Sequence, residues 1–310
     1  MKIVFMGTPD FSVGIIKALH DSPHEVVLAV TQPDRPKGRS GKLVPCPVKE
    51  YAESAGIEVF QCEKVKSPEA VEKLREYNAD LFVVAAFGQI LSKEILEMPR
   101  FGCINVHASL LPKYRGASPI QQAILDGEKT TGVTIMQMNE GLDTGDILIS
   151  KEVAIDEKET GGSLFDKLAK AGSSLVTLAV DGIEKGELVP KKQDDEKASY
   201  AGIIKKERGR IDFSGNAADI ERLIRAFDPW PSAQTSFSGK TLKLWQADVT
   251  EKNTDSLPGT VTGITKDSFT VSCGSGELVV KELQLEGKKR MSTKDFLLGN
   301  DLKEGDRLGE

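Results

Sequence analysis

Short apolar runs alternate with amphipathic segments along the first 140 residues. The runs are KIVFM (2–6), VVLAV (26–30), EVF (58–60), LFVVAA (81–86), CINV (103–106) and VTIMQM (133–138). Their continuous apolar character is typical of strands that are buried on both faces. Between them, residues 11–20, 48–55 and 68–77 repeat apolar side chains at helical spacing. The alternation predicts an α/β fold with a Rossmann-like, mostly parallel sheet and helices on both of its faces.

The pattern changes after about residue 186. The stretch KGELVPKKQDDEKASYAGIIKKERGR is polar and aperiodic, and after it come a helical pattern over 216–227 and short β-prone runs separated by glycine turns. We therefore predict an N-terminal domain over 1–188, a linker over 189–205 and a smaller C-terminal domain over 206–310. Such strands fit a barrel or a sandwich, and a β-barrel of the OB-like kind is our prediction.

Length and composition agree with two domains. A chain of 310 residues with 39% hydrophobic residues exceeds what one hydrophobic core usually supports. The start, MKIVFMGTPDF, is too short in its apolar part for a signal peptide or a membrane span, so we expect a cytoplasmic protein. The cysteines Cys46, Cys62, Cys103 and Cys273 form no CxxC pair, which indicates neither a disulfide framework nor a zinc site.

One basic segment stands out against a net charge of -6, which argues against a chain that coats nucleic acid indiscriminately. Residues 35–49, RPKGRSGKLVPCPVK, hold Arg35, Lys37, Arg39, Lys42 and Lys49 and no acidic residue. A charge run of this kind is usually a solvated face, and the alternative is a contact with an anionic partner.

Asn105 and His107 lie where the apolar run CINV ends. A histidine at a strand end suits proton transfer or stabilisation of an oxyanion, although a lone histidine is more often only partly buried and hydrogen-bonded. Asn105 shares its strand face because it lies two residues earlier. Together the pair offers two donors to the tetrahedral intermediate of an acyl transfer.

Asp143, in the glycine-bracketed loop GLDTGD, is the third candidate. An aspartate there is equally typical of an ordinary turn. If the runs that precede His107 and Asp143 end at the same rim of the sheet, its carboxylate would orient the imidazole. No nucleophile accompanies them, because Ser109 lies in no GxSxG turn and Cys103 lies inside an apolar run. This pattern favours direct transfer between two bound substrates, and GTPDFSVG matches no phosphate-binding loop.

Five motifs, in order, carry a family resemblance over nearly the whole chain. GTPDF, TQPDRPKGR, CINVHASLLPKYRGASPIQ, TGVTIMQMNEGLDTGDIL and IRAFDPWP closely resemble the methionyl-tRNA formyltransferase family. The resemblance implies transfer of the formyl group of 10-formyltetrahydrofolate to the α-amino group of methionyl initiator tRNA, for translation initiation. It also implies that Asn105, His107 and Asp143 are the catalytic residues, that no metal takes part, and that residues 1–188 form the catalytic domain.

The same resemblance implies two binding regions. The folate slot is implied at Phe87, Gln89, Ile90, Leu91, Ser109, Leu110, Leu111, Pro112 and Asn139, although apolar side chains among them are also typical of a core. Contacts with tRNA are implied at Arg35, Lys37, Arg39, Lys42, Lys205 and Lys206, with Arg39 reaching the acceptor end. The segment GRSGK departs from relatives that carry adjacent lysines there. We expect a monomer.

Two alternatives remain open. The first is another folate-dependent formyltransferase, such as one acting on glycinamide ribonucleotide or on an amino sugar, which would lack the long basic loop. The second is a noncatalytic RNA-binding protein of the same fold, which would have lost Asn105, His107 or Asp143. The sequence retains all of these features.

Overall fold

The computed structural model describes residues 1–37, 41–252 and 254–309. The chain divides into two compact units. The N-terminal unit comprises Met1–Pro119, Thr130–Ala154 and Phe165–Ala201, and the C-terminal unit comprises Ile120–Lys129, Ile155–Leu164 and Gly202–Glu310. Within the described ranges, no helix combines the length and the apolar character that crossing a bilayer requires.

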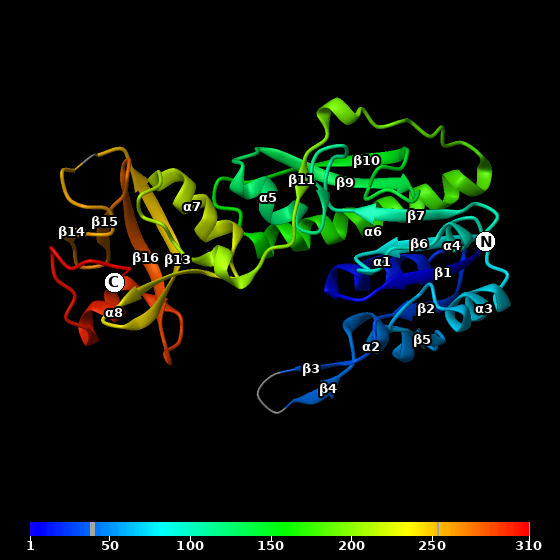
Figure 1. Cartoon of the computed structure of the whole chain (residues 1–310), viewed down its shortest axis with the longest axis horizontal. Helices are drawn as coiled ribbons and strands as arrows, with labels where there is room; N and C mark the ends of the chain where they lie inside the picture. The colour runs from blue at the N-terminus through cyan, green and yellow to red at the C-terminus, as the bar shows by residue number, and fades with distance from the viewer. Residues whose placement is uncertain (38–40, 253, 310) are drawn as a thin grey trace. The chain divides into compact units, whose positions relative to one another are not determined.

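A seven-stranded sheet forms the centre of the N-terminal unit, in the order β10-β9-β7-β6-β1-β2-β5 (Figure 1). Its strands are β1 (Lys2–Gly7), β2 (Glu25–Thr31), β5 (Val59–Gln61), β6 (Leu81–Ala85), β7 (Cys103–His107), β9 (Thr130–Gln137) and β10 (Ile147–Ala154). The first five are parallel, whereas β9 runs antiparallel to both β7 and β10. The predicted α/β class with a mostly parallel sheet is confirmed.

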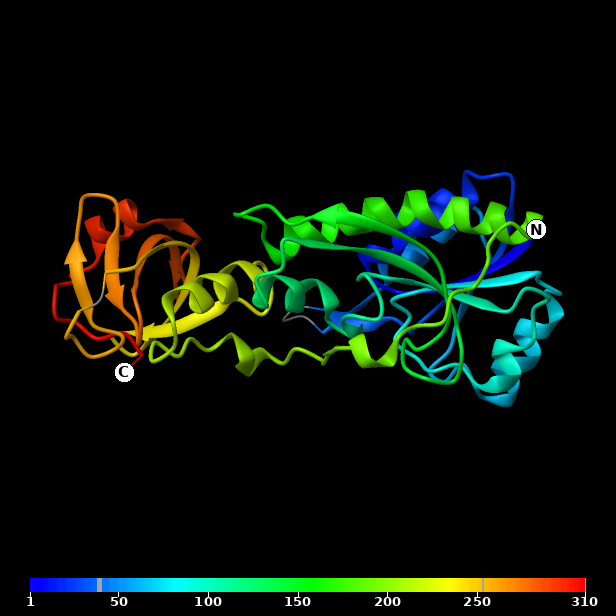
Figure 2. The same ribbon diagram turned by 90° about the horizontal axis from the view of Figure 1, so that it is seen from above.

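Helices cover both faces of this sheet (Figure 2). They are α1 (Asp10–His20), α2 (Pro47–Ser54), α3 (Pro68–Glu76), α4 (Lys93–Leu96) and the long α6 (Gly161–Lys185). On one face, Leu74 of α3 and Ile95 of α4 share an apolar cluster with Val84. On the other face α6 approaches the sheet closely, because a Cβ added at Gly172 would lie 3.1 Å from a methyl group of Val106. Neighbouring residues of a strand therefore point to different helix layers.

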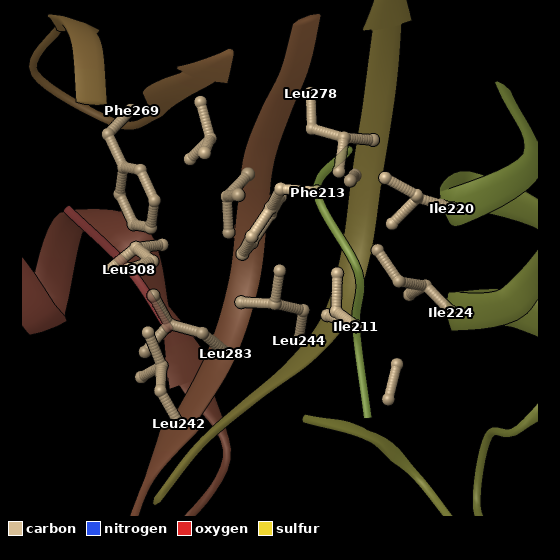
Figure 3. Packing of buried hydrophobic residues seen from close by; sticks show 14 of the residues in the cluster. Ile211, Phe213, Ile220, Ile224, Leu242, Leu244, Phe269, Leu278, Leu283 and Leu308 are labelled. Carbon is tan, nitrogen blue, oxygen red and sulfur yellow. The ribbon is translucent and has the colours of Figure 1, made fainter. Parts of the chain in front are cut away.

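The C-terminal unit is built on an antiparallel sheet in the order β12-β13-β16-β15-β14. Its elements are α7 (Ala217–Ala226), β12 (Ala233–Phe237), β13 (Lys240–Thr250), β14 (Val261–Ile264), β15 (Phe269–Ser272), β16 (Glu277–Leu285), β17 (Met291–Ser292) and α8 (Thr293–Gly299). Figure 3 shows Leu244 and Leu283 of the sheet in one apolar cluster with Ile220 and Ile224 of α7. The predicted C-terminal domain of short strands is confirmed as an antiparallel sheet.

Five short elements and two 3-10 turns complete the chain. They are β3 (Arg35–Lys37), β4 (Lys42–Val44), β8 (Arg115–Gly116), α5 (Pro119–Leu125), β11 (Tyr200–Ala201), and the turns Asp195–Lys197 and Lys206–Gly209. The pairing of β8 with β11 matters for the site, because it brings residues about 85 positions apart into register, Arg115 with Tyr200 and Gly116 with Ala201.

Candidate active site

Asn105 and His107 lie on the face of β7 that carries the α3 and α4 layer. Asn105 pairs in register with Val84 of β6, whose side chain belongs to that apolar cluster. Asn105 is half-buried, and its side chain makes no hydrogen bond within the described part of the chain. An amide in this position retains its full capacity to donate to a ligand.

His107 is buried, and one ring nitrogen is already engaged. Its Nε2 lies 2.8 Å from the backbone carbonyl oxygen of Tyr114. A carbonyl oxygen only accepts, so we assign the proton of the neutral ring to Nε2. The other nitrogen, Nδ1, is thereby left with a lone pair that can take up a proton.

Asp143 is the third of the candidate catalytic residues. Its Oδ2 lies 3.7 Å from Nδ1 of His107, and the same oxygen accepts a 2.8 Å hydrogen bond from the backbone N–H of Gly116. The carboxylate is therefore aimed at the one ring nitrogen that is available for proton transfer.

The expectation that β7 and β9 end at the same rim is wrong. The two strands are antiparallel, and Gln137, the last residue of β9, pairs with Ile104 near the start of β7. Asp143 reaches His107 because the loop after β9 returns to the histidine. Within that loop Asp143 has φ 53°, a left-handed conformation that aspartate tolerates better than most residues.

Gly116 has no tolerance for a side chain. Its φ is 109°, and an added Cβ would lie 2.7 Å from the carbonyl oxygen of Ala201. This glycine lets β8 approach β11 while its N–H holds the Asp143 carboxylate.

We expect Gly116→Ala to lower the free energy of unfolding by about 1–3 kcal/mol, because alanine is strained at this φ and clashes with β11. Urea unfolding followed by circular dichroism measures the change. Gly202→Ala is the matched control, since an added Cβ there meets no atom of the described chain within 4 Å. Equal stability of the two variants would show that β8 does not depend on this glycine.

A hydrogen-bonded group that the sequence analysis did not identify lies next to Asp143. Gln193 donates to the backbone of the Asp143 loop, and its side-chain oxygen accepts from the guanidinium of Arg115, which also pairs with Asp195 at 2.7 Å. Burial disfavours the charged form of Arg115, but hydrogen bonds to Asp195 and Tyr200 outweigh it and raise its pKa.

Neither nearby nucleophile candidate is suited to attack. Ser109 is fully buried, and its hydroxyl donates to the carbonyl oxygen of Lys113 at 2.6 Å. Burial raises the pKa of the Cys103 thiol to about 12, so it carries its proton at neutral pH. The geometry therefore supports general acid–base chemistry without a covalent enzyme intermediate.

The candidate folate residues of the 87–91 segment differ in their surroundings. Phe87 and Leu91 are buried in the apolar cluster under α3 and α4. Gln89 accepts a hydrogen bond from the N–H of Val65 and donates to the carbonyl oxygen of Cys62. Ile90, which is 72% exposed, presents its apolar surface outward. Of these residues, Ile90 has the most surface available to a ligand.

The remaining folate candidates form or flank tight turns. Leu111 is buried, whereas Leu110 and Pro112 are half-buried. Asn139 is exposed, and its side-chain oxygen accepts from Thr144 and from the N–H of Gly141, which shapes the loop that carries Asp143. Asn139 thus has a local structural role in addition to any contact with a ligand.

Within the basic segment, the short strands β3 and β4 pair antiparallel. Lys37 of β3 pairs in register with Lys42 of β4, and the Arg35 side chain donates to Gln32. Arg39 lies outside the described residues. Lys205 and Lys206 are exposed in the C-terminal unit.

A cavity of about 440 Å³ lies elsewhere, lined by Leu74, Arg75, Asn78, Ala79, Phe82, Glu94, Glu97 and Met98. None of these residues belongs to the candidate site. Across residues 1–37, 41–252 and 254–309, no group of three or more histidine, cysteine or acidic side chains is arranged to hold a metal ion.

Comparisons with known proteins define the class. Residues 1–180 match the family described as "Formyl transferase", and residues 203–301 match "Formyl transferase, C-terminal domain". The chain belongs to this formyl transferase family and is an enzyme of it, as its sequence motifs predict.

Its relatives narrow the family further. The chain is 54% identical to the methionyl-tRNA formyltransferase of Lachnospira eligens, with 100% of both chains covered. It is 52% identical to that of Agathobacter rectalis, with 98% of both covered. Within the formyl transferases, the chain belongs to the methionyl-tRNA formyltransferase family.

A solved structure shares the fold. A sugar 3N-formyl transferase, determined in the presence of dTDP and 5-N-formyl-THF, superimposes with a TM-score of 0.66 at 21% identity. The match covers 93% of this chain and 99% of that one.

Proposed function

We propose that this enzyme transfers the formyl group of 10-formyltetrahydrofolate to the α-amino group of methionyl initiator tRNA. The observation that carries the proposal is the pairing of Asp143 with His107 beside a strand face that also carries Asn105. Asp143 lies 3.7 Å from Nδ1 of His107. Asn105 lies on the same strand face as His107, and its amide has no hydrogen-bond partner among the described residues. The names of the full-length relatives support tRNA as the acceptor.

The reaction uses these three residues in separate roles. The free amine attacks the formyl carbon, a new C–N bond forms, and the formyl oxygen becomes an oxyanion. Asn105 donates to this oxyanion, and the imidazole of His107, once protonated at Nδ1, donates as well. Asp143, whose carboxylate lies 3.7 Å from Nδ1, stabilises the imidazolium.

Collapse of the intermediate completes the transfer. The bond between the formyl carbon and N10 of the folate breaks, and N10 takes up a proton while the attacking amine loses one. His107 is suited to shuttle this proton, because Tyr114 holds Nε2 and leaves Nδ1 free. No nucleophile of the chain is needed.

The folate would bind against the segments that flank these residues. Ile90, which is 72% exposed, and the half-buried Leu110 offer apolar surface for a flat heterocycle. Phe87, Gln89, Leu91, Ser109, Leu111, Pro112 and Asn139 would form the wall and its supporting turns. The crystal structure of the sugar 3N-formyl transferase, which was determined with a formylated folate present, supports a folate donor.

The tRNA would be held by the basic residues Arg35, Lys37, Arg39 and Lys42, with Lys205 and Lys206 as further contacts with phosphates. We also propose that the enzyme acts as a monomer. A charged tRNA substrate also supports a cytoplasmic location.

The direct test is an assay with labelled 10-formyltetrahydrofolate and methionyl initiator tRNA. We expect label in N-formylmethionine after hydrolysis of the ester. Glycinamide ribonucleotide and a nucleotide-linked amino sugar are the competing acceptors, and labelling of either one instead of tRNA would contradict the proposal. Binding of tRNA without any transfer would favour the noncatalytic RNA-binding alternative.

Arg39→Ala is expected to lower kcat/KM for the charged tRNA by about 10-fold or more, because charge-assisted contacts with phosphates contribute about 1.5–3 kcal/mol each. Steady-state kinetics with varied tRNA gives this value. The affinity for the folate donor should stay unchanged. Lys252→Ala, an exposed lysine of the C-terminal unit, is the control for loss of one positive charge. An unchanged kcat/KM for Arg39→Ala would remove this residue from the proposed tRNA contacts.

A further inference from the structure

Residues 193–201, which we call the brace, contact the backbone next to both His107 and Asp143. The side-chain N–H groups of Gln193 donate to the carbonyl oxygens of Asp143 at 2.8 Å and Gly145 at 2.7 Å. At its other end, Ala201 pairs in register with Gly116, whose N–H holds the Asp143 carboxylate. The loop of Asp143 is therefore held both through its backbone and through its carboxylate.

The brace also contacts Tyr114, the residue whose carbonyl oxygen accepts a hydrogen bond from His107. The hydroxyl oxygen of Ser199 accepts a 2.9 Å hydrogen bond from the N–H of Tyr114. The carbonyl oxygen of Tyr114 is the group that fixes Nε2 of His107. Both members of the His–Asp pair thus depend on groups that contact this one segment.

Arg115 fixes the orientation of the Gln193 amide. The side-chain oxygen of Gln193 accepts two hydrogen bonds from Arg115, at 3.1 Å from Nε and 2.8 Å from Nη2. Arg115 is 2% exposed and is itself paired with Asp195. Rotation of the amide would break these bonds and place its oxygen against two carbonyl oxygens, so only one orientation is stable.

The loop that receives these bonds needs support. Asp143 has a left-handed backbone with φ 53°, and the loop must return from the end of β9 to reach His107. Non-glycine residues in this conformation persist where surrounding contacts hold them. Two hydrogen bonds from one half-buried side chain, on either side of Thr144, supply such contacts.

We propose that Gln193 is a positioning residue of the formyl transfer and acts through Asp143. It touches no reacting atom, and its role rests on the proposed function. Arg115 and Gln193 form one unit in which a buried cation fixes an amide and the amide fixes the catalytic loop.

The variant Gln193→Met keeps the approximate length of the side chain and removes both donors. We expect kcat to fall by about 10- to 100-fold, because a misplacement on the order of 1 Å at a catalytic group costs about 100-fold. KM for the folate donor should change by less than about threefold. Gln284→Met is the matched control, since Gln284 also donates to a backbone carbonyl but lies in the C-terminal sheet.

A double-mutant cycle separates positioning from general stability. If Gln193 acts through Asp143, adding Gln193→Met to Asp143→Asn should leave kcat within about threefold of Asp143→Asn alone. If the double variant shows the product of the two single-variant losses in kcat, the proposal is overturned. A wild-type kcat for Gln193→Met would overturn it as well. If Gln193→Met does not fold, Gln193→Glu replaces it in the cycle. This variant retains a partner for Arg115 but sets carboxylate oxygens against the two carbonyls.

Hydrogen exchange gives a readout that does not require activity. In Gln193→Met, amides of residues 139–146 should exchange about 10-fold faster or more, whereas those of β1 should not change. Unchanged exchange in the loop would contradict the positioning role even if kcat falls. Failure of the wild-type enzyme to formylate tRNA would reject the proposed function, while the exchange result would still decide whether Gln193 holds the loop.

Discussion

Replacing His107 with alanine is expected to lower kcat for formyl transfer by about 1000-fold or more. The substitution removes both the proton acceptor and one donor to the oxyanion. Each effect contributes about 100-fold or more, and because one ring supplies both, the two factors do not multiply fully. Rapid-quench measurement with saturating tRNA and folate donor gives the rate directly. Binding of tRNA should stay nearly unchanged, because the ring is buried beneath the site.

The control for this variant is His20→Ala, an exposed histidine at the end of α1. Loss of His107 also leaves the carbonyl oxygen of Tyr114 without its ring donor, which costs about 1 kcal/mol of stability. Thermal unfolding should therefore be recorded for both variants. Turnover near the wild-type rate in folded His107→Ala would reject His107 as a catalytic residue.

Asp143→Asn is expected to lower kcat on the order of 1000-fold. Asparagine keeps the size of the side chain, can still accept from the N–H of Gly116 and tolerates the left-handed backbone. What it loses is the negative charge 3.7 Å from Nδ1 of His107, which stabilises the protonated ring. The same rapid-quench assay measures the loss.

Asp21→Asn removes an aspartate charge that pairs with exposed Lys17, and it serves as the control. Exposed pairs of this kind contribute little, so kcat and stability should stay near wild type. A fall in kcat for Asp143→Asn no larger than for Asp21→Asn would show that the charge at Asp143 plays no part in the transfer.

The sequence predicted six of the seven strands of the N-terminal sheet because they are apolar runs, as strands buried between two helix layers are. The edge strand β10 was not predicted, because its sequence ILISKEVA mixes apolar and charged residues and is largely exposed. The sequence also selected Asn105 and His107 at the end of such a strand and Asp143 in the loop after another, and family motifs supported the choice. The reason given for their convergence was wrong, since β9 is antiparallel to β7. Buried parallel and antiparallel strands both appear as apolar runs, so the pattern does not reveal strand direction.

Two other features of the structure, α6 and the role of Gln193, gave only weak signals in the sequence. The 25-residue α6 was not predicted, because it starts with two glycines and includes Gly172 and Gly182, which lower helix propensity. Its stability comes from packing, which at Gly172 brings the backbone onto Val106 and Val133. Gln193 lies in a polar, aperiodic segment, and its partners are backbone carbonyls that no side-chain pattern marks.

The central claim is that Asn105, His107 and Asp143 surround the carbon that is transferred. A crystal structure of the enzyme with a folate carrying a non-transferable formyl group tests it most directly. We predict that the formyl oxygen lies within about 3 Å of the Asn105 amide nitrogen and of Nδ1 of His107, with the Asp143 carboxylate still next to the ring. A formyl group bound away from these side chains, in an otherwise ordered complex, would contradict the account.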